Sequence, residues 1–229
     1  MRWYARPEGD KHQLRVAPEL DSWNKTGDPA QVRLLAFVDD TEALLAVSRV
    51  DSPWTLRLDI GLPTGLNLLD NKRDVDNYAS RLAFRLQKRF PGLVSVWCTK
   101  QHSDQSFVRV EPARETPPPS GHVLVARPTT SYDKPGGAYK EEIRSAIAGA
   151  KELPAGPVRL ELAFVVGFTM NWINLWKPTI DALDPLLGRV RSHRGWDPLD
   201  GRITELGMHL TVDPTERYGV VIGIAATTA

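Results

Sequence analysis

Two segments of alternating apolar residues, one in each half of the chain, constrain its fold more than any other feature of the sequence. Residues 55–62 and 157–164 both alternate apolar side chains with the residues between them. A repeat of two residues is typical of a strand that buries one face. The sequence therefore predicts one such strand in each half, with these apolar positions: Leu56, Leu58, Ile60 and Leu62, then Val158, Leu160, Leu162 and Phe164.

Each predicted strand leads through an irregular stretch into a predicted helix with an Asn near its start. The approaches are residues 73–78 and 171–177, and the helices are residues 79–89 and 178–189. A helix is also predicted over residues 138–150, whereas residues 29–50 fit either one long helix or a strand followed by a helix. Two strands, predicted as a hairpin, follow each main helix: residues 94–100 with 106–111, and residues 203–213 with 219–225.

Three consecutive prolines mark the middle of the chain, within residues 115–121. Such a run favours an extended conformation and is interpreted as a linker, with a long surface loop as the alternative. The predicted domains are residues 1–114 and 122–229, called the first and second halves below. Because the order helix, strand, helix, hairpin occurs in both, the predicted fold is α+β, with two tandem units forming an intrachain pseudo-dimer; chance recurrence of a common order is the alternative.

The composition excludes several classes of protein. There are 29 Lys and Arg residues against 28 Asp and Glu, so a net charge of +1 gives no bulk electrostatic argument for a nucleic-acid or membrane partner. The single cysteine, Cys98, excludes a disulfide framework and a cysteine zinc site, and is compatible with the cytoplasm. No apolar run suggests a signal peptide or a membrane helix. The function must therefore come from motifs.

The sharpest local feature is the pair Asp74 and Asp76, followed by Asn77. One Asp would serve as a helix cap, so a cap or a solvated turn is one interpretation. In an extended approach both carboxylates would face one point, where they repel by roughly 4 kcal/mol at 4 Å and an effective dielectric of 20. A divalent cation removes that repulsion, and Mg²⁺ is commonly held by one or two carboxylates with water and phosphate. A metal site is the second interpretation.

The second half offers a different set of polar residues. Asn174 and Lys177 precede the predicted helix, and Asp181 follows one turn later. Asp200 lies in a turn just before a predicted strand. This Asp-Gly pair either opens the turn or projects a carboxylate toward Asn174 and Lys177.

Basic and aromatic residues admit two interpretations each. Arg81 and Arg85 are one helical turn apart, as are Arg85 and Arg89, so this stripe would either track phosphates or form a solvated face. Trp172 and Trp176 are expected in the core rather than stacked on bases. The candidate DNA contacts are Arg73, Arg81, Arg85, Arg189, Arg191 and Arg194.

Residues 121–225 resemble the RusA-type Holliday junction resolvase family. The resemblance rests on the AYKEEIRSAIAGA helix, the PVRLELAF strand, the N-x-x-K run, the 196–200 turn and the closing strands. In that family a D-x-D-N-x-x-K pattern opens a helix and a third Asp comes from a turn, and these acids bind Mg²⁺. Asn174, Lys177 and Asp200 match the pattern here, whereas Asn171 and Ile173 replace the two leading acids.

The first half resembles the same family in a complementary way. Asp74, Asp76 and Asn77 match the leading acids and the Asn, but Ser80 stands in place of the Lys. No third Asp follows the helix directly, and Asp104 is the nearest substitute.

Three arrangements remain open. One site is built on the first-half acids alone, or the halves pool their residues, or both sites are inactive. The pooled arrangement, with Asp200 and Lys177 facing Asp74 and Asp76, is the least expected, because in the family each subunit makes its own site.

The resemblance implies a Mg²⁺-dependent, structure-selective endodeoxyribonuclease that hydrolyses phosphodiesters in branched DNA during recombination or repair. The implied partner is DNA, and the implied state is a cytoplasmic monomeric pseudo-dimer or a homodimer. An inactive DNA-binding or protein-interaction module is the alternative. The expected catalytic residues are Asp74, Asp76, Asp200 and Lys177, and the expected Mg²⁺ ligands are the three Asp residues.

Overall fold

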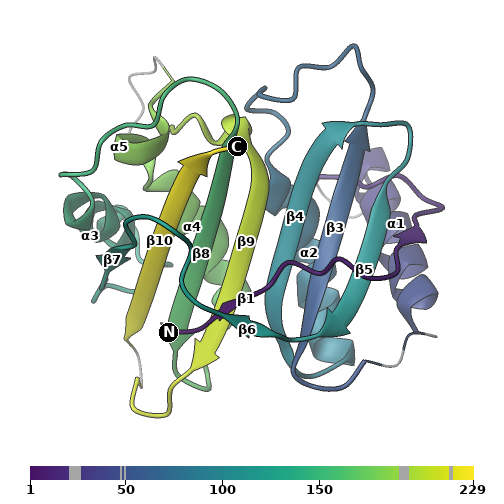
Figure 1. Ribbon diagram of the computed structural model, residues 1–229, viewed down its shortest axis with the longest axis horizontal. Coiled ribbons are helices and arrows are strands. Elements are labelled where there is room, and N and C mark those ends of the chain that lie inside the picture. The colour runs from purple at the N-terminus through teal and green to yellow at the C-terminus, as the bar shows by residue number, and fades with distance from the viewer. Residues whose placement is uncertain (21–26, 47, 49, 191–195, 217–218) are drawn as a thin grey trace.

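The protein, described by a computed structural model over residues 1–20, 27–46, 48, 50–190, 196–216 and 219–229, has an α+β fold built on one large mixed sheet. The sheet has eight strands in the order β2-β5-β3-β4-β9-β8-β10-β7 (Figure 1). Their bounds are β2 His12–Gln13, β3 Trp54–Leu62, β4 Leu93–His102, β5 Phe107–Pro112, β7 Leu124–Ala126, β8 Val158–Val166, β9 Ile203–Val212 and β10 Val220–Thr228.

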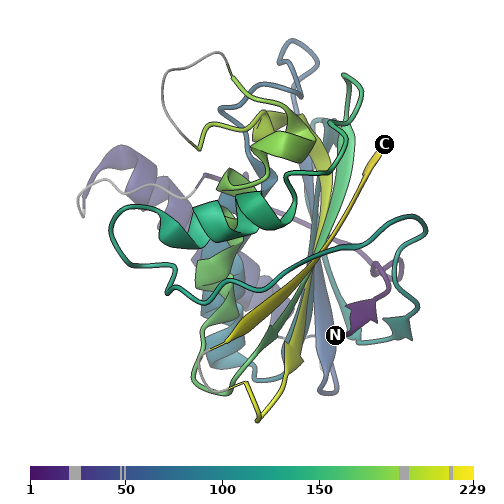
Figure 2. The same ribbon diagram turned by 90° about the vertical axis from the view of Figure 1, so that its left-hand side faces the viewer.

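The helices lie on one face of this sheet, and a two-stranded sheet of β1 (Trp3–Tyr4) and β6 (Glu115–Thr116) lies on the other (Figure 2). None of the helices in the described ranges is long and apolar enough to span a membrane. Their bounds are α1 Pro29–Leu45, α2 Val75–Arg89, α3 Ala138–Ala146, α4 Trp176–Asp181 and α5 Asp184–Leu187, with short 3₁₀ turns η1 Trp172–Leu175 and η2 Asp200–Arg202.

The two strands predicted from alternation are confirmed as β3 and β8. The ambiguous region between residues 29 and 50 contains a single helix, α1, from residue 29 to residue 45. Its start follows from local chemistry: Pro29 occupies the first helical position, and the Asp28 carboxylate accepts a hydrogen bond from the Ala30 backbone N–H at 2.8 Å.

The predicted hairpins are wrong, because β4 and β5 are not neighbours and neither are β9 and β10. β3 lies between β4 and β5, parallel to β4 and antiparallel to β5. β8 lies in the same way between β9 and β10. The physical reason is that β3 and β8 are buried on both faces over most of their length, which favours interior positions. The intervening helical segments provide the crossovers that parallel neighbours need.

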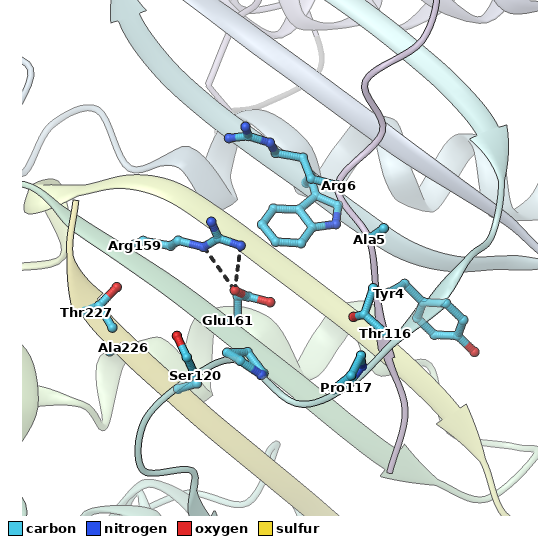
Figure 3. Close-up of a pocket in the computed structure, with 13 residues that line it drawn as sticks. Tyr4, Ala5, Arg6, Thr116, Pro117, Ser120, Arg159, Glu161, Ala226 and Thr227 are labelled. Atoms are coloured by element: carbon cyan, nitrogen blue, oxygen red, sulfur yellow. Dashed lines mark hydrogen bonds and ion pairs between the residues drawn. The ribbon is translucent and has the colours of Figure 1, made fainter.

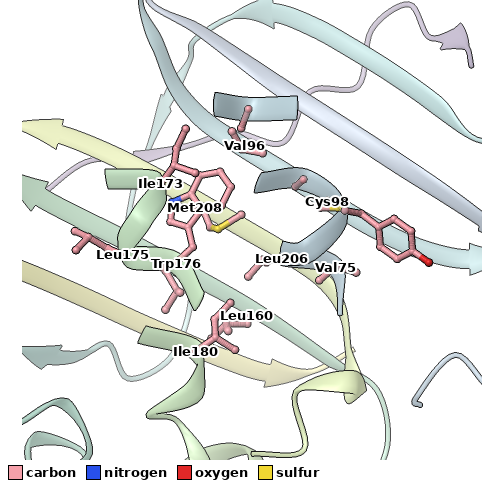
Figure 4. Close-up of a cluster of buried hydrophobic side chains, with 14 of the residues drawn as sticks. Val75, Val96, Cys98, Leu160, Ile173, Leu175, Trp176, Ile180, Leu206 and Met208 are labelled. Carbon is pink, nitrogen blue, oxygen red and sulfur yellow. The ribbon is translucent and has the colours of Figure 1, made fainter. Parts of the chain in front are cut away.

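β4 and β9 pair antiparallel at the centre and join the two halves into one sheet. The apolar core is likewise continuous across this junction (Figure 4). Val96 and Cys98 of the first half pack in the same cluster as Leu160, Leu206 and Trp176 of the second. A shared sheet and a shared core therefore connect the parts of the chain on either side of residues 115–121.

The opposite face of the sheet buries a histidine. His209 is fully buried, with its Nδ1 3.0 Å from the Ser95 hydroxyl and its Nε2 3.4 Å from a Glu161 carboxylate oxygen. The rings of Trp3 and Trp97 each lie 5.4 Å from the imidazole, centre to centre. Burial lowers the pKa of His209 below its usual 6.5, although hydrogen bonding to Glu161 opposes this. The folded protein therefore holds this imidazole neutral.

We predict that His209 makes the protein less stable in mild acid. The unfolded chain binds a proton on this residue at a higher pH than the folded chain, so its contribution to stability is present above pH 6.5 and falls as the pH drops below it. The effect is at most about 1.4 kcal/mol per pH unit. Urea unfolding at pH 7.5 and 5.5 should show that His209→Gln costs less stability at the lower pH.

The comparison of variant and parent at each pH cancels the other titrating groups. His102→Gln, which changes an exposed histidine, is the matched control for the loss of an imidazole. An equal cost of His209→Gln at both pH values would contradict the prediction.

Candidate functional site

Asp74 and Asp76 lie at the start of α2, below the surface, with exposures of 8% and 3%. The predicted extended approach through residue 78 is wrong, because the helix already begins at Val75. Asp74 is the cap residue by position, but its side chain caps no backbone N–H. Instead its carboxylate accepts a hydrogen bond from the Asn77 amide at 3.2 Å. Helix capping therefore does not account for this carboxylate.

Asp200 comes from the second half, in the turn η2 that precedes β9. Two hydrogen bonds hold this turn against the loop before α2. The Gly201 backbone N–H donates to the Asn71 side-chain oxygen at 3.1 Å, and the Asn71 amide donates to the Pro198 carbonyl at 3.4 Å. A side chain at position 201 would collide with the backbone of residues 70 and 71, so a glycine permits this approach.

Lys100 of β4 also links the loop before α2 to the turn η2, through two hydrogen bonds. Its side chain is buried, and its ammonium donates to the Arg73 carbonyl at 2.9 Å and to the Gly201 carbonyl at 2.6 Å. Burial lowers the pKa of Lys100 to about 8, while the nearby carboxylates oppose that change. Sequence analysis missed this residue. The alternation of the strand could have indicated that its side chain is buried, because Lys100 lies two residues after Cys98 and four after Val96, which are both buried.

The ammonium of Lys177 brings the predicted residues together. It lies 2.7 Å from a carboxylate oxygen of Asp200 and 3.4 Å from one of Asp74. A further 3.4 Å contact joins it to Asp181, one turn along the helix. Residues of both halves thus meet in one cluster, which is the pooled arrangement that was least expected. Asp104, the substitute considered for a first-half site, is exposed in the turn between β4 and β5.

Burial and mutual repulsion perturb the acids of this cluster. Burial, followed by the charge of Asp200, raises the pKa of Asp74 to about 7, against the opposing effect of Lys177. Burial likewise raises the pKa of Asp76 to about 6. Burial alone would lower the pKa of Lys177, but the surrounding carboxylates raise it above its usual value. Lys177 is therefore charged at neutral pH, and the carboxyl groups of Asp74 and Asp76 keep their protons to a higher pH than usual.

Two observations on the carboxylates of the cluster concern metal binding. One carboxylate oxygen of Asp74 is buried and has no hydrogen-bond partner, as an oxygen left for a cation would be. Carboxylates are the ligands that Mg²⁺ prefers, and the cluster offers those of Asp74, Asp76 and Asp200, the three expected ligands, and also that of Asp181. Within the described ranges, however, no three His, Cys, Asp or Glu side chains converge closely enough to hold an ion as they stand.

Trp172 and Trp176 lie in the core, as predicted, beside the residue Lys177. Trp172 and Trp176 are each 1% exposed and pack edge to face with ring centres 5.0 Å apart. The Trp172 indole N–H donates to the Gln87 side chain of α2 at 2.7 Å. This pair fixes the helical turn of Lys177 against the helix that carries the two leading acids.

A cleft of about 810 Å³ opens beside the cluster, between α2 and the η1–α4 segment. Its walls carry residues of both signs together with aromatic and apolar side chains. They include Asp76, Ser80, Arg81, Phe84, Tyr132, Lys140, Asn174, Lys177 and Asp181.

The predicted DNA-contact residues lie in different surroundings. Arg81 is exposed at the cleft, and the Arg73 guanidinium lies 3.4 Å from the Tyr78 hydroxyl. Arg85 and Arg189 are already engaged in ion pairs, with acids of α1 and with Asp184 respectively. Arg191 and Arg194 lie outside the described residues.

A smaller hollow of about 270 Å³ lies on the other face of the sheet, away from the helices (Figure 3). Its central charged groups are Arg159 and Glu161, which pair with each other at 2.9 Å. Burial alone would raise the pKa of Glu161, but His209 and Arg159 lower it below its usual value, so the hollow lacks the raised carboxyl pKa values found for Asp74 and Asp76.

We predict that removal of the Lys177 charge will raise the pKa values of Asp74 and Asp76 further. An adjacent cation typically lowers a carboxyl pKa by about one to three pH units, and Lys177 lowers both values here. Lys177→Met should shift both aspartate titrations upward when they are followed by carboxyl ¹³C NMR.

Lys140→Met is the matched control, because Lys140 pairs with Asp181 at 2.7 Å and is not among the main charges that shift the pKa of Asp74 or Asp76. Unchanged aspartate midpoints in Lys177→Met would contradict the geometry of the cluster.

Comparison with known proteins adds no family to these observations. No protein-family model matches the chain, and no curated protein matches its sequence. A function must therefore be argued from the residues of the cluster and the shape around them.

Proposed function

We propose that this protein is a Mg²⁺-dependent endodeoxyribonuclease that hydrolyses phosphodiester bonds in branched DNA. The observation that carries the proposal is the meeting of Asp74 and Asp76 from the first half with Asp200 and Lys177 from the second. These are the residue types of the RusA-type pattern, two leading acids, a lysine and a third acid. Each half lacks part of the set, and the cluster supplies one complete set.

We further propose that the chain is a pair of tandem RusA-like units forming a pseudo-dimer. Equivalent strand pairings in the two halves support this: β3 and β8 each pair parallel with the next strand and antiparallel with the one after it. The antiparallel β4–β9 contact would then be the former subunit interface. Because one chain provides both units, we expect a monomer, with a homodimer as the alternative. We expect the protein in the cytoplasm.

Under this proposal, the residues of the cluster take separate roles in phosphodiester hydrolysis. Asp74, Asp76 and Asp200 would hold Mg²⁺, which when bound lowers the pKa of a bound water and stabilises charge on phosphate. Lys177 would place its ammonium against a phosphate oxygen and neutralise the charge that develops there. Lys100 keeps the two acidic loops in contact through its bonds to their carbonyls.

One observation favours a different function. Lys177 already contacts Asp74, Asp181 and Asp200, so its ammonium occupies the centre of the acids. In a catalytically inactive module this ion-pair cluster would be structural, and the chain would bind DNA or a protein without cleaving it.

We predict that Asp74→Asn with Asp76→Asn will abolish Mg²⁺-dependent cleavage. Loss of a partner that only orients a metal ligand costs about 10- to 100-fold, so loss of two ligands should cost more than about 100-fold. Cleavage of four-way junctions, flaps and single strands should be measured for parent and variant, with Mg²⁺ affinity by calorimetry. Asp104→Asn, which alters an exposed carboxylate, should keep both the cleavage activity and the Mg²⁺ affinity of the parent.

The outcomes separate the two functions. Cleavage that persists in the double variant would exclude the cluster as the catalytic site. Junction binding without cleavage of any substrate, in the parent protein, would favour the inactive module.

A further inference from the structure

One wall of the cleft changes in character along α2. Asp76, Ser80, Arg81 and Phe84 all line the cleft from this helix, in that order. At a rise of 1.5 Å per residue, Asp76 and Phe84 are about 12 Å apart along the helix axis. The wall thus passes from a recessed carboxylate to an exposed guanidinium and then to an aromatic ring.

A second aromatic side chain lines the cleft away from α2. Tyr132 is half-buried, and its hydroxyl accepts a hydrogen bond from the Asn174 amide at 3.0 Å. Apolar side chains of the η1–α4 segment, Ile173 and Pro178, line the space near it. The cleft thus combines planar apolar surface with positive charge next to the acids, and its volume falls within the usual range for small-ligand sites.

The charges around the cleft argue against a long duplex on this face. Tracking a duplex takes several unpaired cations, each neutralising a phosphate. Arg85, however, pairs with Asp39 at 3.0 Å and with Glu42 at 3.2 Å, and Arg89 lies 3.7 Å from Glu42. Acids of α1 therefore neutralise most of the basic stripe on α2.

The depth of the acids points the same way. Asp74, Asp76 and Asp200 are all less than 10% exposed, and the more exposed Lys177 side chain contacts Asp74 and Asp200. A phosphate can approach such recessed groups more closely when its strand is free of a partner strand. The aromatic rings beside them can stack on any base, because every base has a π face.

We propose that the cleft binds an unpaired nucleotide, with the base against Phe84 and Tyr132 and the adjoining phosphate toward Arg81 and Lys177. This deepens the proposed function and rests on it: the preferred substrate is a strand with unpaired bases next to the bond that is cut. The Lys88 ammonium lies over one face of the Phe84 ring, 4.4 Å from its centre, so the base would stack on the other face.

The test measures binding without cleavage. An oligonucleotide carrying 2-aminopurine is titrated with the full chain in EDTA, first as a single strand and then within a continuous duplex of the same sequence. Stacking should quench the fluorescence of the single strand, with at least tenfold tighter binding than for the duplex. Since stacking on one aromatic ring contributes about 1–3 kcal/mol per base, Phe84→Ala should weaken single-strand binding by about 5- to 150-fold.

Further variants separate stacking from folding. Phe84→Leu keeps an apolar side chain but removes the ring, and should weaken binding like Phe84→Ala at an unchanged melting temperature. Tyr132→Phe keeps the ring and should keep most of the affinity for the single strand, whereas Tyr132→Ala removes the ring and should lose that affinity. Phe168→Ala is the matched control, because Phe168 is 76% exposed and does not line the cleft.

Equal affinity for single strand and duplex, or full affinity in Phe84→Leu, would overturn the inference. The two proposals fail in different ways. Aspartate-dependent cleavage of continuous duplex that is unaffected by Phe84→Leu would leave the nuclease standing and remove the nucleotide site. Ring-dependent binding of single strands without Mg²⁺-dependent cleavage would leave the binding site and remove the nuclease.

Discussion

The antiparallel pairing of β4 with β9 is the contact on which the candidate site depends. Because these central strands run in opposite directions, the last residues of β4 lie beside the first residues of β9. Lys100 near the end of β4 bonds the carbonyls of Arg73 and Gly201, and so joins the loop before α2 to the turn before β9. Without this strand pair, Asp74 and Asp200 would belong to separate surfaces.

Burying the charged groups of the cluster costs free energy, and the ion pairs that they form do not account for that cost through added stability of the fold. Burying carboxylates disfavours their charged form, and a buried ion pair often contributes little net stability. Here the pKa of Asp74 is raised to about 7 and that of Asp76 to about 6, beside an ammonium that three carboxylates contact. Groups perturbed by burial and by charged neighbours within a cleft are a frequent mark of functional sites.

The sequence predicted what depends on local periodicity and missed what depends on long-range pairing. Alternation located β3 and β8, and helical spacing located the tryptophans in the core. The insertion of β3 between β4 and β5 was not predictable, because nearness along the chain favours a hairpin. The ion pairs of the α2 arginines were not predicted for the same reason, since their partners Asp39 and Glu42 lie on another helix.

Under the proposed duplication, Asp74 and Asn171 occupy equivalent positions, and their side chains now behave differently. The Asn171 side chain accepts a hydrogen bond from the Ile173 backbone N–H at 3.2 Å and so caps its own turn. Ile173, at the position of the second acid, is buried in the core. Asp74 leaves its helix uncapped and directs its carboxylate to Lys177 instead. An uncapped helix forgoes about 1 kcal/mol, so the retained acid is explained by the cluster rather than by its own helix.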